Sequence, residues 1–130
     1  MVSSIKNIAG SVTLQNIMGT MNLANFRIGG NSGHNLAINN CTKVYLDFLD
    51  LSTSGGGLDI DNHTFVQVNS STLGNVCTID ANCTVYCHNA TLQNVTANNS
   101  KVTLRKCSTR EVDVTKSRLY LLGCNIQTGY

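Results

Sequence analysis

Two carboxylates and a histidine, Asp59, Asp61 and His63, have the spacing that comes closest to a catalytic group. Alternate residues of a strand point the same way, so Asp59 and Asp61 could share general acid and general base work on a glycosidic bond. His34, in an earlier glycine-rich segment, could approach them. No nucleophile elbow, phosphate-binding loop or triad order accompanies these residues. We therefore expect a protein without catalytic activity and keep Asp59, Asp61 and His63 as the catalytic candidates.

Six cysteines are the other residues with reactive side chains. Cys83, Cys87 and His88 resemble half of a zinc site, but strand alternation turns Cys87 inward and His88 outward, so their side chains diverge. Inward positions that suit a small apolar residue hold Cys77, Cys87, Cys107 and Cys124. We expect free, buried thiols, hence folding in a reducing compartment, and neither a metal nor a cofactor.

An asparagine that recurs at slowly shrinking intervals marks the strands that position these residues. Asn16, Asn40, Asn62, Asn82 and Asn99 lie 24, 22, 20 and 17 residues apart, and Lys116 follows after another 17. Each comes after an apolar-x-apolar triplet, and two further apolar-x-apolar segments precede the next asparagine. Three period-2 segments per repeat predict a three-sided coil of stacked parallel strands.

The repeat defines one all-β domain, 1–130, with no second unit. We expect residues 1–11 to form a partial rung, 12–126 to form about six three-sided rungs that shrink from 24 to 17 residues, and 127–130 to be a tail. The extra residues of the early rungs fall in two Gly/Ser-rich corner loops, 29–35 and 52–57. Such loops are tolerated insertions in a solenoid and can also carry function.

The asparagine column has a physical reason. Asparagine tolerates the left-handed backbone conformation that a bend requires, and stacked asparagine side chains can hydrogen-bond along the coil. We therefore interpret the seven Asn-x-Ser/Thr sequences as solenoid composition rather than as glycosylation sites.

Outward columns of the second strand in each rung favour a binding role. Its middle column alternates aromatic with polar residues, in the order Asn22, Tyr45, Gln67, Tyr86, Thr103, Tyr120. Tyrosine and arginine are enriched at contact surfaces because they offer rigid area and directed hydrogen bonds. The predicted binding face comprises Lys43, Tyr45, Phe65, Tyr86, His88, Lys101, Arg105, Arg118 and Tyr120.

Charge and hydropathy limit the partners. The net charge of +2 is too small to indicate nucleic acid. No apolar run approaches the ~20 residues that cross a bilayer, so we expect no membrane partner.

The columns resemble the single-chain right-handed parallel β-helix of pectate-lyase-like enzymes and of bacteriophage tailspikes and tail fibres. The resemblance covers about residues 5–126 and is one of architecture, without a family-specific motif. It implies a non-enzymatic receptor-binding or oligomerisation domain in the virion or the host cytoplasm, whose partners are its own copies, as an expected homotrimer, or a protein or glycan receptor, or both. Two alternatives stay open: a small intracellular inhibitor or adaptor, possible for a phage protein acting on its host, and a minimal carbohydrate-active enzyme.

Overall fold

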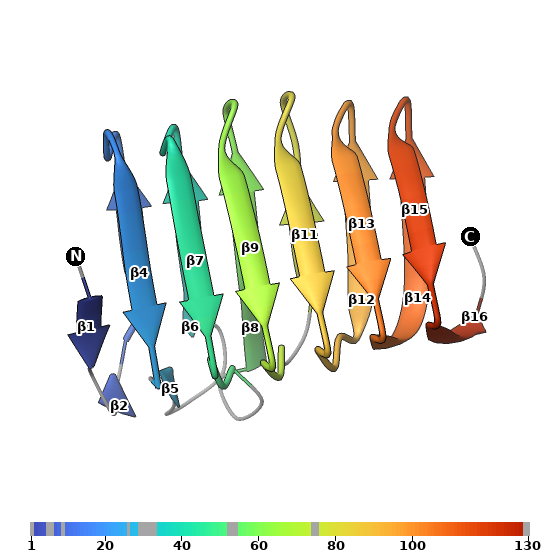
Figure 1. The fold of residues 1–130 in the computed structure, drawn as a ribbon, viewed down its shortest axis with the longest axis horizontal. Helices are drawn as coiled ribbons and strands as arrows, with labels where there is room; N and C mark the ends of the chain where they lie inside the picture. The colour runs from blue at the N-terminus through green and yellow to red at the C-terminus, as the bar shows by residue number, and fades with distance from the viewer. Residues whose placement is uncertain are drawn as a thin grey trace.

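The computed structural model describes residues 2–4, 7–8, 10–25, 27–28, 34–51, 55–73 and 76–128. These residues form strands, turns and bends, with no helix among them. The strands stack in parallel as a coil of about five turns, which advances in the right-handed sense from the N-terminus to the C-terminus (Figure 1). The predicted right-handed parallel β-solenoid is confirmed.

Two seven-stranded parallel sheets form the first and second faces of the coil. The sheet of the second face contains, in spatial order, β1 (Val2–Ser4), β4 (Thr20–Ala24), β7 (Lys43–Asp47), β9 (Phe65–Asn69), β11 (Thr84–His88), β13 (Lys101–Arg105) and β15 (Arg118–Leu122). The sheet of the first face contains β3 (Val12–Gln15), β6 (His34–Asn39), β8 (Gly55–Asp61), β10 (Val76–Ile79), β12 (Asn94–Asn98), β14 (Ser108–Thr115) and β16 (Asn125–Thr128).

The third face is a narrow ladder. It begins with β2 (Asn7–Ile8) paired to β5 (Arg27–Ile28) and continues as single-residue bridges through Asp50, Thr72, Thr91 and Ser108. β14 starts on this face and turns onto the first face, so β16 can pair with its beginning. The third side therefore closes the coil with the least pairing.

The strand pairing confirms that the number of residues per rung decreases along the chain. Pairing on the first face joins Val12, Leu36, Leu58, Cys77, Val95 and Val112 in one column. The steps between them are 24, 22, 19, 18 and 17 residues. The predicted corner loops lie largely outside the described residues, but their last residues belong to strands, since β6 begins at His34 and β8 at Gly55.

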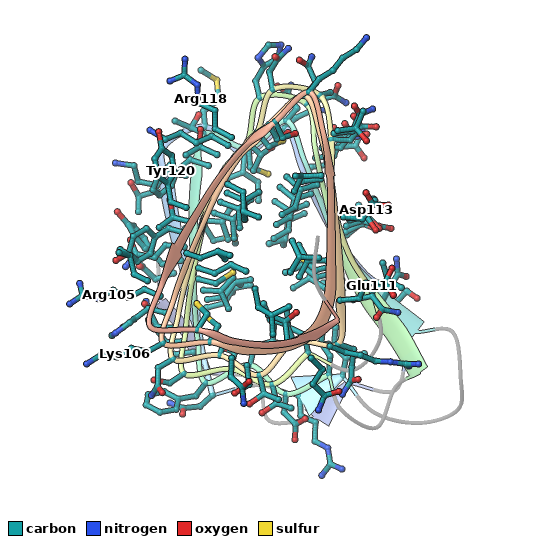
Figure 2. All side chains as sticks on the ribbon, turned by 90° about the vertical axis from the view of Figure 1, so that its right-hand side faces the viewer. Arg105, Lys106, Glu111, Asp113, Arg118 and Tyr120 are labelled. Carbon is teal, nitrogen blue, oxygen red and sulfur yellow. The ribbon has the colours of Figure 1, made fainter. Side chains whose placement is uncertain are left out.

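The core is a column of inward side chains inside the triangular section, which Figure 2 shows along the coil. Alternate residues of each strand point into it, so Val44 and Leu46, or Val66 and Val68, have no exposed surface. Complete burial of such a side chain contributes about 1.5–3 kcal/mol. In the last rung the inward residues are covered on one side, and Leu121 remains 44% exposed.

Residues in the left-handed backbone conformation, with positive φ, form two of the three corners. At the first corner, all six predicted positions have φ between 48° and 66°: Asn16, Asn40, Asn62, Asn82, Asn99 and Lys116. A second such column, which the sequence did not reveal, stands between the second and third faces and contains Asn25, Phe48, Ser70, Asn89, Lys106 and Gly123. At the first corner His63 and Ala81 are also left-handed, so two rungs have one extra turn residue.

The predicted asparagine ladder is only partly formed. Asn40 Nδ2 donates to Asn16 Oδ1 at 2.8 Å and Asn99 Nδ2 to Asn82 Oδ1 at 3.3 Å, but Asn62 Nδ2 donates to Asn39 instead of Asn40. The backbone of Asn62 is still level with that of Asn40, since Asn40 N donates to Asp61 O at 3.1 Å, but His63 rather than Asn62 is level with Asn82, since His63 N donates to Ala81 O at 3.0 Å. The extra corner residue therefore interrupts the column between Asn62 and Asn82. These asparagine side chains are also exposed, so packing inside a ladder does not shield them from modification.

A column of hydroxyl and thiol groups, buried in its first four members, lies just inside the first corner. It consists of Cys41, Thr64, Cys83, Ser100 and Ser117. Each of the first four donates its backbone N–H to the side chain one rung further on, from Cys41 N to Thr64 Oγ1 at 3.1 Å through to Ser100 N to Ser117 Oγ at 3.0 Å. The same side chains donate to backbone carbonyls of their own corner, as Thr64 Oγ1 does to Asp61 O at 2.7 Å. The column thus satisfies buried backbone groups that the bend removes from the sheets.

Candidate binding face

The second face gathers all nine residues of the predicted binding face onto one flat sheet. Pairing places Asn22, Tyr45, Gln67, Tyr86, Thr103 and Tyr120 side by side in successive strands. Adjacent strands lie about 4.8 Å apart, so the three tyrosines project at intervals of roughly 10 Å with a smaller side chain between them. The result is a row of aromatic ridges along the coil. Their binding role stays a prediction.

Contacts between neighbouring rungs fix the aromatic side chains. The rings of Tyr45 and Phe65 meet edge to face at 6.5 Å, and Lys43 Nζ lies 5.7 Å from the Phe65 ring centre. Two rungs away from this group, Lys101 Nζ lies 5.7 Å from the ring centre of Tyr120, which is 46% exposed. Such cation–π pairs hold the rings in defined orientations. The face therefore presents ordered aromatic area before any partner arrives.

Charges of the second face are mainly positive. Its outward positions carry Lys43, Lys101, Arg105 and Arg118 against one carboxylate, Asp47, which gives a net charge of +3. Asp47 accepts a hydrogen bond from Asn69 Nδ2 at 2.8 Å. The face would therefore attract an acidic surface and repel a basic one.

The first face has the opposite charge. Its described outward positions carry five carboxylates, a net charge of −5: Asp59, Asp61, Asp80, Glu111 and Asp113. Arg110, which precedes Glu111 in β14, lies at the corner with the third face, beside Ser108 and Asn125. Looking down the coil, Figure 2 shows Arg118, Tyr120 and Arg105 on one side of the section and Glu111 and Asp113 on the other. The small overall charge of +2 thus hides a strong separation. The one ion pair among the described residues, between Arg27 and Asp50 at 3.9 Å, lies on the third face.

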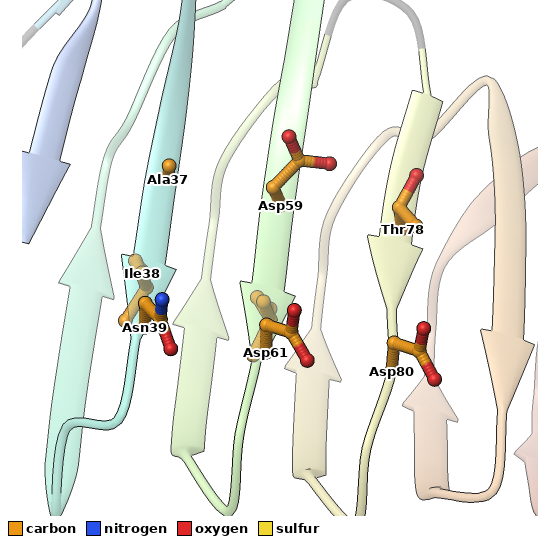
Figure 3. Close-up of a pocket in the computed structure, with 8 residues that line it drawn as sticks. Ala37, Ile38, Asn39, Asp59, Asp61, Thr78 and Asp80 are labelled. Atoms are coloured by element: carbon orange, nitrogen blue, oxygen red, sulfur yellow. The ribbon is translucent and has the colours of Figure 1, made fainter. Parts of the chain in front are cut away.

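A shallow hollow of about 350 Å³ lies on the first face across β6, β8 and β10 (Figure 3). In one column of its lining Asp59 stands between the small side chains of Ala37 and Thr78, and in the next column Asp61 and Asp80 are neighbours (Figure 3). Asn35 Nδ2 donates to Asp59 Oδ2 at 3.2 Å, and Asp61 and Asp80 each accept the backbone N–H of the next residue.

The catalytic candidates are only partly assembled. Asp59 and Asp61 point outward from β8 as alternation predicted, but His63 is an exposed left-handed corner residue. The side chain of His34 is outside the described residues. Sequence reasoning overlooked Asp80 as the neighbour of Asp61, although the pairing of Ile60 with Ile79 follows from the predicted columns.

All six cysteines are free, and five of them are buried. Burial, aided by the carboxylate of Asp59, raises the pKa of the Cys77 thiol to about 12. Burial also raises the pKa of the Cys83, Cys87 and Cys107 thiols. A protonated, buried thiol is a poor nucleophile and a poor metal ligand, so these cysteines serve the core.

The described residues contain neither a candidate metal site nor a candidate membrane-spanning helix. No cluster of three or more His, Cys, Asp or Glu residues is arranged to hold a metal ion there. No helix long and apolar enough to cross a membrane occurs within the same residues. Comparison with protein-family models, with curated proteins and with solved structures found no match to this chain.

Proposed function

We propose that this protein is a non-enzymatic binding or assembly module that engages an acidic partner surface through its second face. The observation that carries the proposal is the row of Tyr45, Tyr86 and Tyr120, flanked by Lys and Arg, on one flat parallel sheet. Rigid aromatic rings supply contact area at low entropic cost, and the cations supply attraction and orientation.

The setting that we propose is a receptor-binding or oligomerisation domain of the tail-fibre kind. This part of the proposal is supported by the resemblance of the coil to that architecture. A rigid solenoid suits such a role because stacking presents the same row of side chains over many rungs without a hinge.

Binding to immobilised acidic probes tests the role of the second face. Poly-L-glutamate and polygalacturonate would be compared with neutral dextran by biolayer interferometry, at low and at high salt. We expect retention on the two acidic probes that weakens with salt, and its loss when Tyr45, Tyr86 and Tyr120 are replaced together by Ser.

A matched control replaces Thr72, Thr91 and Thr96 by Ser on the other two faces. Those three threonines are exposed and lie outside the second face. Far-UV circular dichroism would show that both variants keep the coil. Equal retention of the tyrosine variant and the control, or no retention of the unaltered protein on either acidic probe, would refute the proposal.

A further inference from the structure

The two large faces of the coil match each other in charge. The second face carries a net +3 and the first face a net −5, and within the chain the charges of these two faces form no ion pair among the described residues. They point away from each other on two sides of the section, so one molecule cannot bring them together (Figure 2). A second copy can.

The faces also match in side-chain size. On the second face the large residues Tyr45 and Tyr86 stand in β7 and β11. At the same rungs of the first face, in β6 and β10, stand the small residues Ala37 and Thr78, which line the hollow. Squarely stacked faces would therefore place tyrosine rings over the hollow.

Register selects the relative direction of the two coils. Each rung pairs one first-face strand with the next second-face strand, so that β3–β4 is rung 1 and β14–β15 is rung 6. The cations of the second face lie on rungs 2, 5 and 6, and the carboxylates of the first face lie on rungs 3, 4 and 6. If the coils run parallel, each cation is level with a carboxylate or one rung, about 4.8 Å, away from it. Lys and Arg side chains span that offset. If one coil is reversed, Arg118 of rung 6 faces rung 1, which has no carboxylate among the described residues.

We propose that the second face of one copy packs on the first face of a second copy, with the two coils side by side and parallel. The proposal rests on the binding role proposed above and names its acidic partner. The contact joins two different faces, so a pair of copies still has one free second face and one free first face, to which further copies can add. Repeated about an axis parallel to the coils, the contact generates a ring where the rotation between neighbouring copies divides a full turn.

The size of the face sets the expected strength. Five residues by six rungs give roughly 16 Å by 29 Å, or about 900 Å² for the two partners together. That is below the standard interface of about 1,200–2,000 Å², so we expect micromolar association that weakens as salt screens the charges.

Charge reversal tests the pairing of faces by analytical ultracentrifugation over a concentration series. We expect the unaltered protein to associate at low salt. Lys101→Glu with Arg118→Glu, on the second face, should give a monomer, and so should Glu111→Lys with Asp113→Lys, on the first face. Combining all four substitutions should restore association, because opposite charges then face each other again at rungs 5 and 6, where the substituted residues lie. Arg110→Glu, beside the third-face residues Ser108 and Asn125, is the control and should not change the mass.

The outcomes separate this inference from the proposed function. A protein that stays monomeric at every concentration, yet binds poly-L-glutamate through its tyrosines, overturns self-association alone. Loss of association from the second-face reversal without an effect of the first-face reversal overturns the pairing of unlike faces. A fourfold variant that remains folded and monomeric also overturns it. Circular dichroism of each variant confirms that the coil is intact.

Discussion

The buried hydroxyl of Thr64 offers the sharpest test of how the corners are stabilised. Thr64 is 1% exposed, accepts the N–H of Cys41 at 3.1 Å and donates to the carbonyl of Asp61 at 2.7 Å. Thr64→Val keeps the shape of the side chain but removes both hydrogen bonds. The substitution therefore isolates the polar contribution without opening a cavity.

The magnitude follows from the two lost partners. Leaving the buried N–H of Cys41 unsatisfied costs about 1–3 kcal/mol, and loss of the bond to Asp61 costs about 0.5–1.5 kcal/mol. We expect the free energy of unfolding to fall by roughly 2–4 kcal/mol, a large part of the ~5–15 kcal/mol of a typical domain. With a urea slope near 2 kcal/mol/M, the midpoint falls by about 1–2 M.

Urea denaturation followed by circular dichroism measures this change. Thr64→Ser retains the hydroxyl and loses one methyl group, so it should cost only about 1 kcal/mol. Thr91→Val makes the same chemical change at an exposed position of the third face and should shift stability by less than about 0.5 kcal/mol. If Thr64→Val is as stable as Thr64→Ser, the hydrogen-bonded column does not stabilise the corner and the reasoning is wrong.

Three further predictions concern backbone conformation and burial. Phe48 is left-handed with φ of 56° and is 60% exposed, so Phe48→Asn should stabilise by about 1 kcal/mol in urea denaturation; a loss of stability would contradict this. A Cβ at Gly57 would overlap the carbonyl oxygen of Val76, so Gly57→Ala should cost about 1–3 kcal/mol or more, while Gly10→Ala, with no atom nearby, should not destabilise the coil. The pKa of Cys77 is raised from 9.0 to about 12, so the native state keeps a proton that the unfolded chain loses. The contribution of the Cys77 thiol to the free energy of unfolding is therefore fully present below pH 9 and is lost as the pH rises toward 12. Cys77→Ala should make the free energy of unfolding fall less steeply with pH over this range, as measured by urea denaturation at alkaline pH.

Part of the candidate site could be read directly from the residues. The alternation in Lys43–Asp47 and Thr84–His88 shows which side chains point outward, and the asparagine spacing aligns these strands. Because strand alternation is a local geometric property, the row of Tyr45, Tyr86 and Tyr120 was predictable without coordinates. The contacts of Lys43 with Phe65 and of Lys101 with Tyr120 were not, since they depend on side-chain rotamers in adjacent rungs.

The second corner shows why other features were not predictable. Phe48 and Lys106 have no preference for the left-handed conformation, so their residue types give no signal. Their backbone N–H groups donate to Asn69 O at 3.1 Å and Leu122 O at 2.8 Å in the next rung. Stacking between rungs, rather than local propensity, therefore imposes the bend.

The amino-acid sequence by itself determined the parallel coil, the inward residues and the first corner. Period-2 alternation and the tolerance of asparagine for a left-handed bend are local properties, and a repeat states them several times over. Alternation already puts Asp59 and Asp113 in one outward column. Only the tertiary structure added Asp61, Asp80 and Glu111 to the same face, because these residues lie at or beyond the ends of the segments that the repeat predicts. It also decided which neighbour each buried hydroxyl, thiol and asparagine meets, because these contacts depend on the local backbone of each corner, as the bond from Asn62 to Asn39 instead of Asn40 shows.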